Sequence, residues 1–185
     1  MKPPVVLAVL VLGAIIGGMA VEYWMTRTAS TPAAQTAAAP SADLAADTAF
    51  LKSVLPTQSH TMTDVGLHWS NLWFAVEKKN WPLARYFFDE ARQSIRWTVV
   101  LRPVRLLPEG GTVDVKGIFT AFDMSALATV QLAIEDQDHA QFVAAYTSAL
   151  DGCQSCHAAS GKPYLRPAVP TAPASTLLNF EPAAK

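Results

Sequence analysis

Apolar residues recur at three- and four-residue spacing along two neighbouring stretches of the chain. The stripe of the first stretch consists of Met62, Val65, Trp69, Leu72, Trp73 and Val76. This spacing predicts an α-helix that begins after the N-cap Thr57 and runs to about Lys78. The stripe of the second stretch consists of Leu83, Phe87, Ala91, Ile95 and Val99. We expect a second helix there, capped by Asn80, with Pro82 tolerated in its first turn and Pro103 at its end.

A third helix is predicted from Ile118 to Gln137, after a connection at 102–117 that is rich in proline and glycine. Its apolar positions are Phe119, Phe122, Leu127, Val130 and Ile134. A break is expected at about 123–125, where the polar Asp123 and Ser125 interrupt the stripe. The connection itself suits either a short hairpin or a crossover, and the sequence does not choose between them.

A fourth helix is predicted from His139 to Ser160, with Asp138 as N-cap and Gly161 just beyond its end. Its inward positions are Phe142, Ala145, Tyr146 and Leu150. Four amphipathic helices with mostly short connections favour an all-α fold, an antiparallel four-helix bundle that spans residues 50–161. The proline-rich residues 162–185 are expected to form an extended tail on its surface.

Residues 1–25 are almost wholly apolar and have two interpretations. As a membrane anchor, their length suffices to span a bilayer, and Tyr23 and Trp24 would lie at the interface. As a signal peptide, they offer a small-residue cleavage site at Gly18-Met19-Ala20. Residues 26–49 are rich in Ala, Thr, Ser and Pro, which predicts a flexible linker and favours the anchor. Both interpretations export the folded domain.

The charge of the chain argues against one class of partner. The net charge is −1 and no long basic run occurs, so we expect no nucleic-acid partner. Arg85, Arg92 and Arg96 share the second helix with Asp89 and Glu90. Ion pairs within this helix are the expected arrangement. The alternative is that one arginine meets a haem propionate or a partner protein.

Cysteine occurs only in the segment Cys153-Gln154-Ser155-Cys156-His157. The pattern C-x-x-C-H predicts covalent attachment of one c-type haem, with His157 as an iron ligand. Both thiols would form thioethers to the haem vinyl groups from one helical turn. A zinc site would lack ligands, and a thioredoxin-type motif would sit in a βαβ pattern that this chain does not show. A plain disulfide does not need the histidine.

The other side of the iron needs a separate candidate. In an up-down-up-down bundle, the end of the fourth helix lies level with the start of the first. Met62 is about five residues into the first helix and belongs to its apolar stripe, so it is our candidate for the sixth ligand. The alternatives are His60, His68 and an open iron, with Met62 then filling the core.

These features resemble the class II cytochromes c, the cytochrome c′-type four-helix bundles that carry C-x-x-C-H near the end of their last helix. The resemblance covers about residues 49–161 and implies haem attachment by Cys153 and Cys156 and ligation by His157. It leaves the sixth position open, because that family includes Met-ligated and five-coordinate members. The long tail departs from the family pattern. One hypothesis is that its Lys162, Tyr164 or Arg166 lies near a haem propionate, and the alternative is a proline-rich segment that only packs on the bundle.

The expected function is a monohaem c-type cytochrome that carries single electrons between periplasmic or membrane partners, such as a membrane respiratory complex. The expected location is the periplasmic side of the inner membrane, anchored by the N-terminal helix, or the soluble periplasm after cleavage. The alternative function is a five-coordinate haem protein that binds a diatomic gas. We expect no enzymatic activity, since a peroxidase would need a distal acid–base group that neither His60 nor His68 is well placed to provide.

Overall fold

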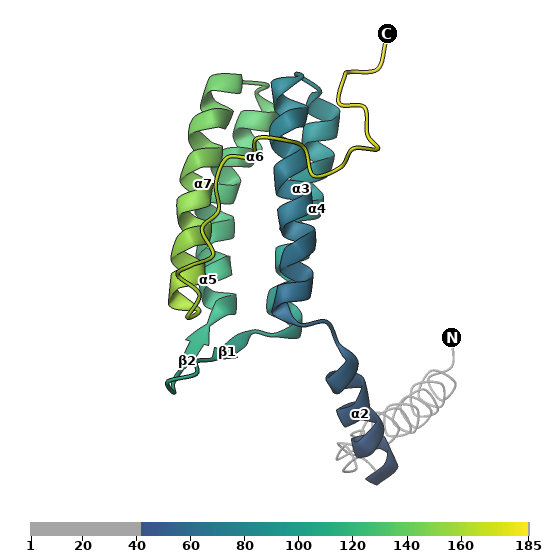
Figure 1. Cartoon of the computed structure of the whole chain (residues 1–185), viewed down its shortest axis with the longest axis vertical. Helices are drawn as coiled ribbons and strands as arrows, with labels where there is room; N and C mark the ends of the chain where they lie inside the picture. The colour runs from purple at the N-terminus through teal and green to yellow at the C-terminus, as the bar shows by residue number, and fades with distance from the viewer. Residues whose placement is uncertain (1–41, 185) are drawn as a thin grey trace, which may run out of the picture. The chain divides into compact units, whose positions relative to one another are not determined.

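The computed structural model describes residues 42–184 and shows a mostly helical chain, which confirms the all-α class (Figure 1). The predicted anchor or signal segment, residues 1–25, lies outside the described residues. The chain divides into two units, residues 1–51 and residues 52–185. The second unit carries the predicted haem motif.

Helix α2, Ala42–Val54, corrects the predicted extent of the linker. We expected flexible chain as far as residue 49, but residues 42–49 are helical. Ala42, Ala45, Ala46 and Ala49 explain the difference, because alanine has the highest intrinsic helix propensity. None of the side chains of α2 is buried, so an apolar stripe could not have revealed this helix.

Helices α3, Gln58–Glu77, and α4, Trp81–Leu101, confirm the first two predicted helices. The Thr57 hydroxyl accepts a hydrogen bond from the backbone N–H of His60 at 3.3 Å. The Asn80 side chain likewise accepts from the N–H of Leu83 at 3.3 Å. Both caps therefore satisfy backbone donors that a helix start leaves without partners.

The connection after α4 contains a hairpin. Strands β1, Val104–Leu106, and β2, Thr112–Asp114, pair antiparallel, with Arg105 opposite Val113. Two glycines with positive φ, Gly110 at 96° and Gly111 at 88°, form the turn between the strands.

The third predicted helix is continuous rather than broken, and it starts earlier than expected. Helix α5, Val115–Phe122, leads into a π-helical segment η1, Asp123–Leu127, and then into α6, Ala128–Glu135. The polar residues at 123–125 therefore mark a π-bulge and not a break. A π-bulge keeps the helix axis but shifts the register of the side chains.

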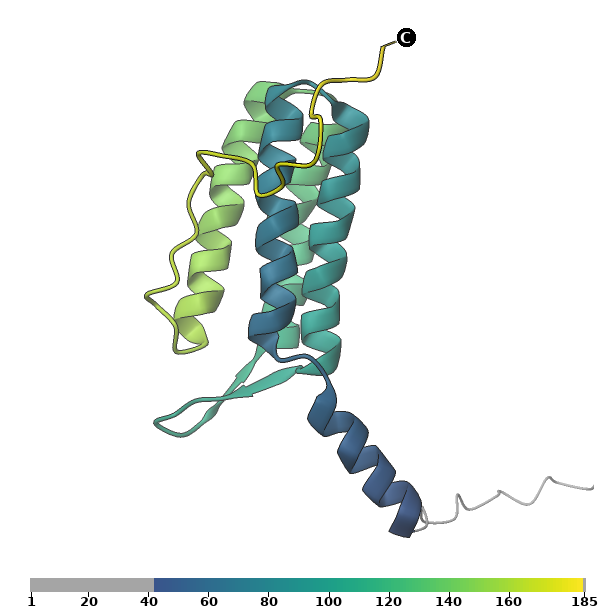
Figure 2. The same cartoon turned by 45° about the vertical axis from the view of Figure 1, so that its right-hand side comes forward.

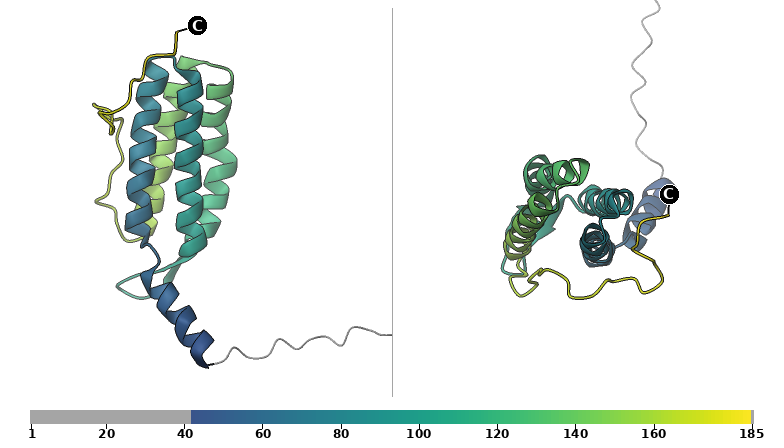
Figure 3. Two further views of the ribbon diagram at one scale, coloured as in Figure 1. Left: turned by 90° about the vertical axis from the view of Figure 1, so that its right-hand side faces the viewer. Right: turned by 90° about the horizontal axis from the view of Figure 1, so that it is seen from above.

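Helix α7, His139–Ala159, confirms the fourth predicted helix. Its N-cap Asp138 accepts from the N–H of Gln141 at 3.0 Å, and Gly161 follows the helix with a φ of 72°. Helices α3, α4, α5–α6 and α7 lie side by side (Figures 1 and 2). Seen from above, α3 lies beside α4 and α7 lies beside α5–α6 (Figure 3).

The core is formed by the predicted apolar faces. Its largest fully buried side chains are Tyr146, Phe87, Phe88, Phe142, Leu72 and Leu127. The only described stretch apolar and long enough to cross a membrane is Val115–Glu135. Because α5, η1 and α6 pack against α4 and α7, this stretch is a helix of the folded domain.

The tail is extended, as predicted, but it also contributes to the core. It runs along α7 and then crosses α3 (Figures 1 and 2). The Asn71 side chain accepts from the N–H of Ser175 at 3.1 Å, and the Asn80 side chain donates to the carbonyl of Phe180 at 3.1 Å. The Phe180 ring is 9% exposed and stacks on Phe87 at 6.1 Å. Residues 175–180 of the tail are thus fixed to α3 and to the start of α4.

Candidate functional site

The two cysteines lie in the last turns of α7, three residues apart and therefore on one face of the helix. Both thiols are free and half-buried. Burial raises the pKa of Cys153 to about 12, and the neighbouring Cys156 contributes to the rise. Burial also raises the pKa of Cys156, although a hydrogen bond with Ser160 opposes it. Both groups are therefore neutral thiols at pH 7 rather than reactive thiolates.

One ring nitrogen of His157 is held by the start of the tail. The Nδ1 atom lies 2.8 Å from the carbonyl oxygen of Leu165. A carbonyl only accepts, so Nδ1 carries a proton, and in the neutral imidazole the lone pair is then on Nε2. Metal-binding histidines typically donate their other N–H in this way. The imidazole thus has the tautomer that an iron ligand needs.

The tail makes this contact through a short turn after α7. The backbone N–H of Lys162 donates to the carbonyl of His157 at 2.8 Å, and that of Leu165 donates to Lys162 at 3.1 Å. The Gln154 side chain, inside the motif, donates to the carbonyl of Pro163 at 3.1 Å. Three contacts therefore join the motif to residues 162–165, and a fourth closes the turn within the tail. Sequence reasoning missed the Leu165 acceptor, because every residue has a carbonyl and nothing marks this one.

Gly152 lets the third helix approach the motif closely. A Cβ atom at Gly152 would lie 2.6 Å from the ring of Phe122. Phe122 is the last residue before the π-helical segment, and the absence of a side chain at Gly152 leaves room for its ring. The glycine directly before the first cysteine was the sequence signal for this packing.

Aromatic contacts set the register between α3 and α7. The rings of Trp69 and Tyr146 stack at 5.0 Å, and the Tyr146 hydroxyl donates to the carbonyl of Trp69 at 3.1 Å. Further along α3, the Trp73 ring lies 6.1 Å from Phe142, which is earlier in α7. Higher numbers on α3 thus meet lower numbers on α7, so the two helices are antiparallel.

This register places Met62 level with Cys153. Met62 precedes Trp69 by seven residues, and Cys153 follows Tyr146 by seven. Seven residues are two turns, about 10 Å along a helix, and they return the side chain to almost the same face. Because the helices are antiparallel, both steps lead in the same direction. Met62 and Cys153 are therefore about level along the α3–α7 pair.

Met62 is half-buried, and its Sδ atom lies 4.0 Å from the hydroxyl of Thr98 on α4. His60 is exposed. The ring of His68 lies 6.1 Å from Phe87 of α4, and its buried Nδ1 has no hydrogen-bond partner in the described part of the chain. Of the three candidates for a sixth ligand, Met62 is the one that the register of α3 and α7 places level with the cysteines. Within residues 42–184, no three His, Cys, Asp or Glu side chains gather as a metal site.

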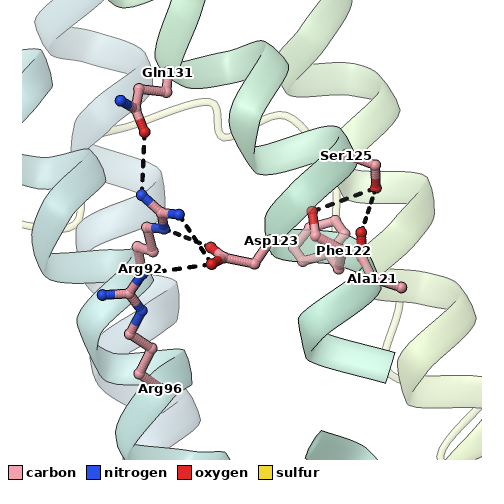
Figure 4. A network of polar contacts seen from close by, with 7 residues as sticks. All are labelled: Arg92, Arg96, Ala121, Phe122, Asp123, Ser125 and Gln131. Carbon is pink, nitrogen blue, oxygen red and sulfur yellow. Dashed lines mark hydrogen bonds and ion pairs between the residues drawn. The ribbon is translucent and has the colours of Figure 1, made fainter. Parts of the chain in front are cut away.

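The arginines of α4 reach beyond their own helix. Arg85 pairs with Asp89 four residues on, as expected, and also with Glu135 of α6. Arg92 donates two hydrogen bonds to the Asp123 carboxylate and one to the Gln131 side chain at 3.1 Å (Figure 4). Asp123 is the first residue of η1, so this network fastens the π-bulge to α4. The sequence did not reveal the pairing, because the partners are 31 positions apart.

Asp123→Asn is expected to destabilise the protein by about 1–3 kcal/mol at pH 7, because it removes a charge-assisted pair from a poorly exposed site. Burial raises the pKa of Asp123, but the hydrogen bonds and charges of Arg92 and Arg96 outweigh it, so this pKa lies below its ordinary value. The stabilisation is therefore present at neutral pH and lost as the pH falls through the folded-state pKa. Urea unfolding between pH 7 and pH 3 measures both effects.

Asp89→Asn is the matched control for this prediction. Asp89 also pairs with an arginine, but both side chains are well exposed, at 41% and 50%. We expect it to cost less than about 1 kcal/mol. Equal losses for the two variants, or a loss for Asp123→Asn that persists unchanged at pH 3, would contradict the assignment of a special role to the Arg92–Asp123 pair.

Comparisons of this chain with protein-family models, with curated proteins and with solved structures found no match. The function is therefore argued from the site alone.

Proposed function

We propose that this chain is a monohaem c-type cytochrome that carries single electrons, with residues 50–161 forming an antiparallel four-helix bundle of the class II type. Cys153 and Cys156 would hold the haem through thioethers, and His157 would bind the iron. The haem would supply a one-electron ferric/ferrous couple. The chain's own residues position the group, select the histidine tautomer and restrict access to the iron.

The hydrogen bond between His157 Nδ1 and the Leu165 carbonyl is the observation that carries this proposal. It leaves Nε2 as the only ring nitrogen with a free lone pair, directly after two free cysteines on the same helix. A disulfide has no use for the histidine, and within residues 42–184 no three His, Cys, Asp or Glu side chains gather as a zinc site would require. A haem needs this combination, since the porphyrin contributes four nitrogens of its own and requires one imidazole and two thiols from the protein.

The residues near the motif suit a bulky apolar ring. The two thiols are half-buried, and the Phe122 ring of the third helix approaches Gly152, the residue before Cys153. Neutral thiols also suit attachment, in which each S–H adds across a vinyl group to form a C–S bond and a C–H bond without a change of oxidation state. The protein thus presents both thiols in the protonated form that this addition consumes.

Met62 is the proposed sixth ligand, because its position level with Cys153 follows from the aromatic register of α3 and α7. A thioether ligand stabilises ferrous iron and raises the reduction potential. It also occupies the position at which a small molecule would bind. Met/His ligation therefore favours electron transfer over ligand binding.

The proposed location and partners depend on whether the N-terminal segment is retained. If residues 1–25 remain as an anchor, the domain acts on the periplasmic side of the inner membrane, where tethering raises its effective concentration for a membrane respiratory complex. If they are removed, it acts as a soluble periplasmic carrier. The partners in both cases are redox proteins.

One observation favours a second function, the binding of a diatomic gas. The Met62 sulfur lies beside the Thr98 hydroxyl of α4, and this contact competes with a bond to iron. If Met62 keeps this contact after haem attachment, the iron is five-coordinate. The sixth position is then free for a gas.

Optical spectra of the haem-loaded chain decide between the two functions. We expect a low-spin spectrum in both the ferric and the ferrous form, and no change when CO is added to the ferrous form. A high-spin ferrous spectrum that shifts with CO would overturn the electron-carrier proposal in favour of gas binding.

A further inference from the structure

A pocket of about 400 Å³ lies where α3 begins and α7 ends. Three of its lining side chains are cationic: Arg102 at the end of α4, Arg105 on β1 and Lys162 after α7. No carboxylate lines it. The hairpin that contributes Arg105 extends from this end of the molecule (Figures 1 and 2). The pocket is therefore lined by positive charge, and no acidic side chain in its lining neutralises it.

The three cations have no ionic partner within residues 42–184. Arg102 donates to the carbonyls of Lys52 and Leu55, but only at 3.4 and 3.5 Å. Arg105 donates to the carbonyl of Ser160 at 2.8 Å and to the Gln58 side chain at 2.9 Å. A guanidinium has five N–H donors, so donors remain free on both arginines. Like charges at this proximity repel one another, and an anion would relieve the repulsion.

The start of α3 adds to the attraction for an anion. Thr57, the N-cap, and the first-turn residues Gln58 and Ser59 line the same pocket. The N-terminus of a helix carries a partial positive charge and free backbone donors. Two independent features, a cationic cluster and a helix start, therefore favour the same kind of ligand.

We propose that this pocket holds a haem propionate, an inference that rests on the proposed function. The pocket adjoins the haem motif, because the Lys162 backbone bonds to His157 and Arg105 bonds to Ser160 at the end of α7. In haem c, the thioethers leave from one edge of the porphyrin and the propionates from the opposite edge. A ring held by α7 would direct its propionates toward the elements that face α7, and Thr57 at the start of α3, Arg102 at the end of α4 and Arg105 of β1 line the pocket from such elements. Arginine recognises a carboxylate with two parallel hydrogen bonds.

Removal of one cation from the pocket tests the proposal. The full chain, loaded with haem, is compared with its Lys162→Gln and Arg105→Gln variants by redox titration. A positive charge near the propionate stabilises the ferrous state, so each variant should have a lower reduction potential than the unmodified chain. Arg105→Lys, which keeps the charge, should recover most of the loss. Lys162→Gln should not disturb folding, since within residues 42–184 the Lys162 side chain has no ion pair to lose and its backbone bond to His157 is kept.

Arg166→Gln is the matched control, because Arg166 is an exposed cation of the tail that does not line the pocket. We expect it to leave the potential unchanged. A shift for Arg166→Gln with none for Lys162→Gln or Arg105→Gln would overturn the proposal and place the propionate at the tail. Equal potentials in all variants would overturn it as well.

Added citrate distinguishes a propionate from a free anion. If a propionate fills the pocket, citrate leaves the potential of the unmodified chain unchanged. A saturable shift with citrate, absent in Arg105→Gln, would mean that the pocket takes an external anion and would overturn the proposal. The proposed function and the propionate site are overturned by different results. A chain without covalent haem overturns the proposed function, whereas a haem-loaded chain with unchanged variants overturns only the propionate site.

Discussion

Replacement of both Cys153 and Cys156 by serine is expected to give a chain that retains no haem after denaturation. A serine hydroxyl does not add across a vinyl group under the conditions in which a thiol does, so neither thioether can form. Both thiols are half-buried and make no disulfide, and serine has a similar size. We therefore expect the helices to form as before. Haem staining after denaturing electrophoresis measures the loss, and circular dichroism verifies the helices.

Ser155→Ala is the control inside the motif. Ser155 lies between the two cysteines, is exposed, and its hydroxyl donates only to the carbonyl of Asp151 at 2.9 Å. This variant should keep the full amount of haem. Haem that remains bound to the denatured double-serine variant would contradict the assignment of the thiols, whatever the behaviour of the control.

Met62→Leu is expected to convert a closed, low-spin iron into an open, high-spin one that binds CO in the ferrous state. Leucine keeps the volume and apolar character of methionine but has no sulfur, so the change removes the ligand and largely preserves the packing. Loss of a thioether should also lower the reduction potential. Absorption spectra with and without CO measure the first effect, and redox titration measures the second.

Met124→Leu is the matched control, because Met124 lies on η1 and its side chain is 74% exposed. It should leave the spectra and the potential unchanged. If Met62→Leu also leaves both unchanged, Met62 is a core residue and another group, or none, occupies the sixth position. If the unmodified chain already binds CO, the gas-binding function replaces electron transfer.

Local sequence signals predicted the helices well. Thr57, Asn80 and Asp138 each accept the backbone hydrogen bond that their positions before an apolar stripe predicted. Gly161 adopts the positive φ expected of a residue just after a helix. These features could be predicted because their causes lie within one or two turns of the residue concerned.

Features with distant causes escaped prediction. Asp123 suggested a break, but Arg92 stabilises a π-bulge there from another helix. Phe180 was expected to lie in a surface tail, but its ring packs against the rings of Phe74 and Phe87. The linker prediction failed at 42–49 because alanine forms helix without an apolar stripe.

The sequence predicted four side chains of the candidate site. The C-x-x-C-H spacing indicated Cys153, Cys156 and His157, and an assumed antiparallel arrangement of the helices indicated Met62. The aromatic register now supports the level of Met62 on independent grounds. The Leu165 carbonyl and the cationic pocket could not be predicted, because both depend on how the tail and the hairpin fold back on the end of α7.

The most direct test of the proposal is the intact mass of the chain after expression with a haem-attachment system. The expected mass exceeds that of the polypeptide by one haem. A mass equal to the polypeptide alone, or smaller by the two hydrogens of a Cys153–Cys156 disulfide, would contradict the assignment of a c-type cytochrome.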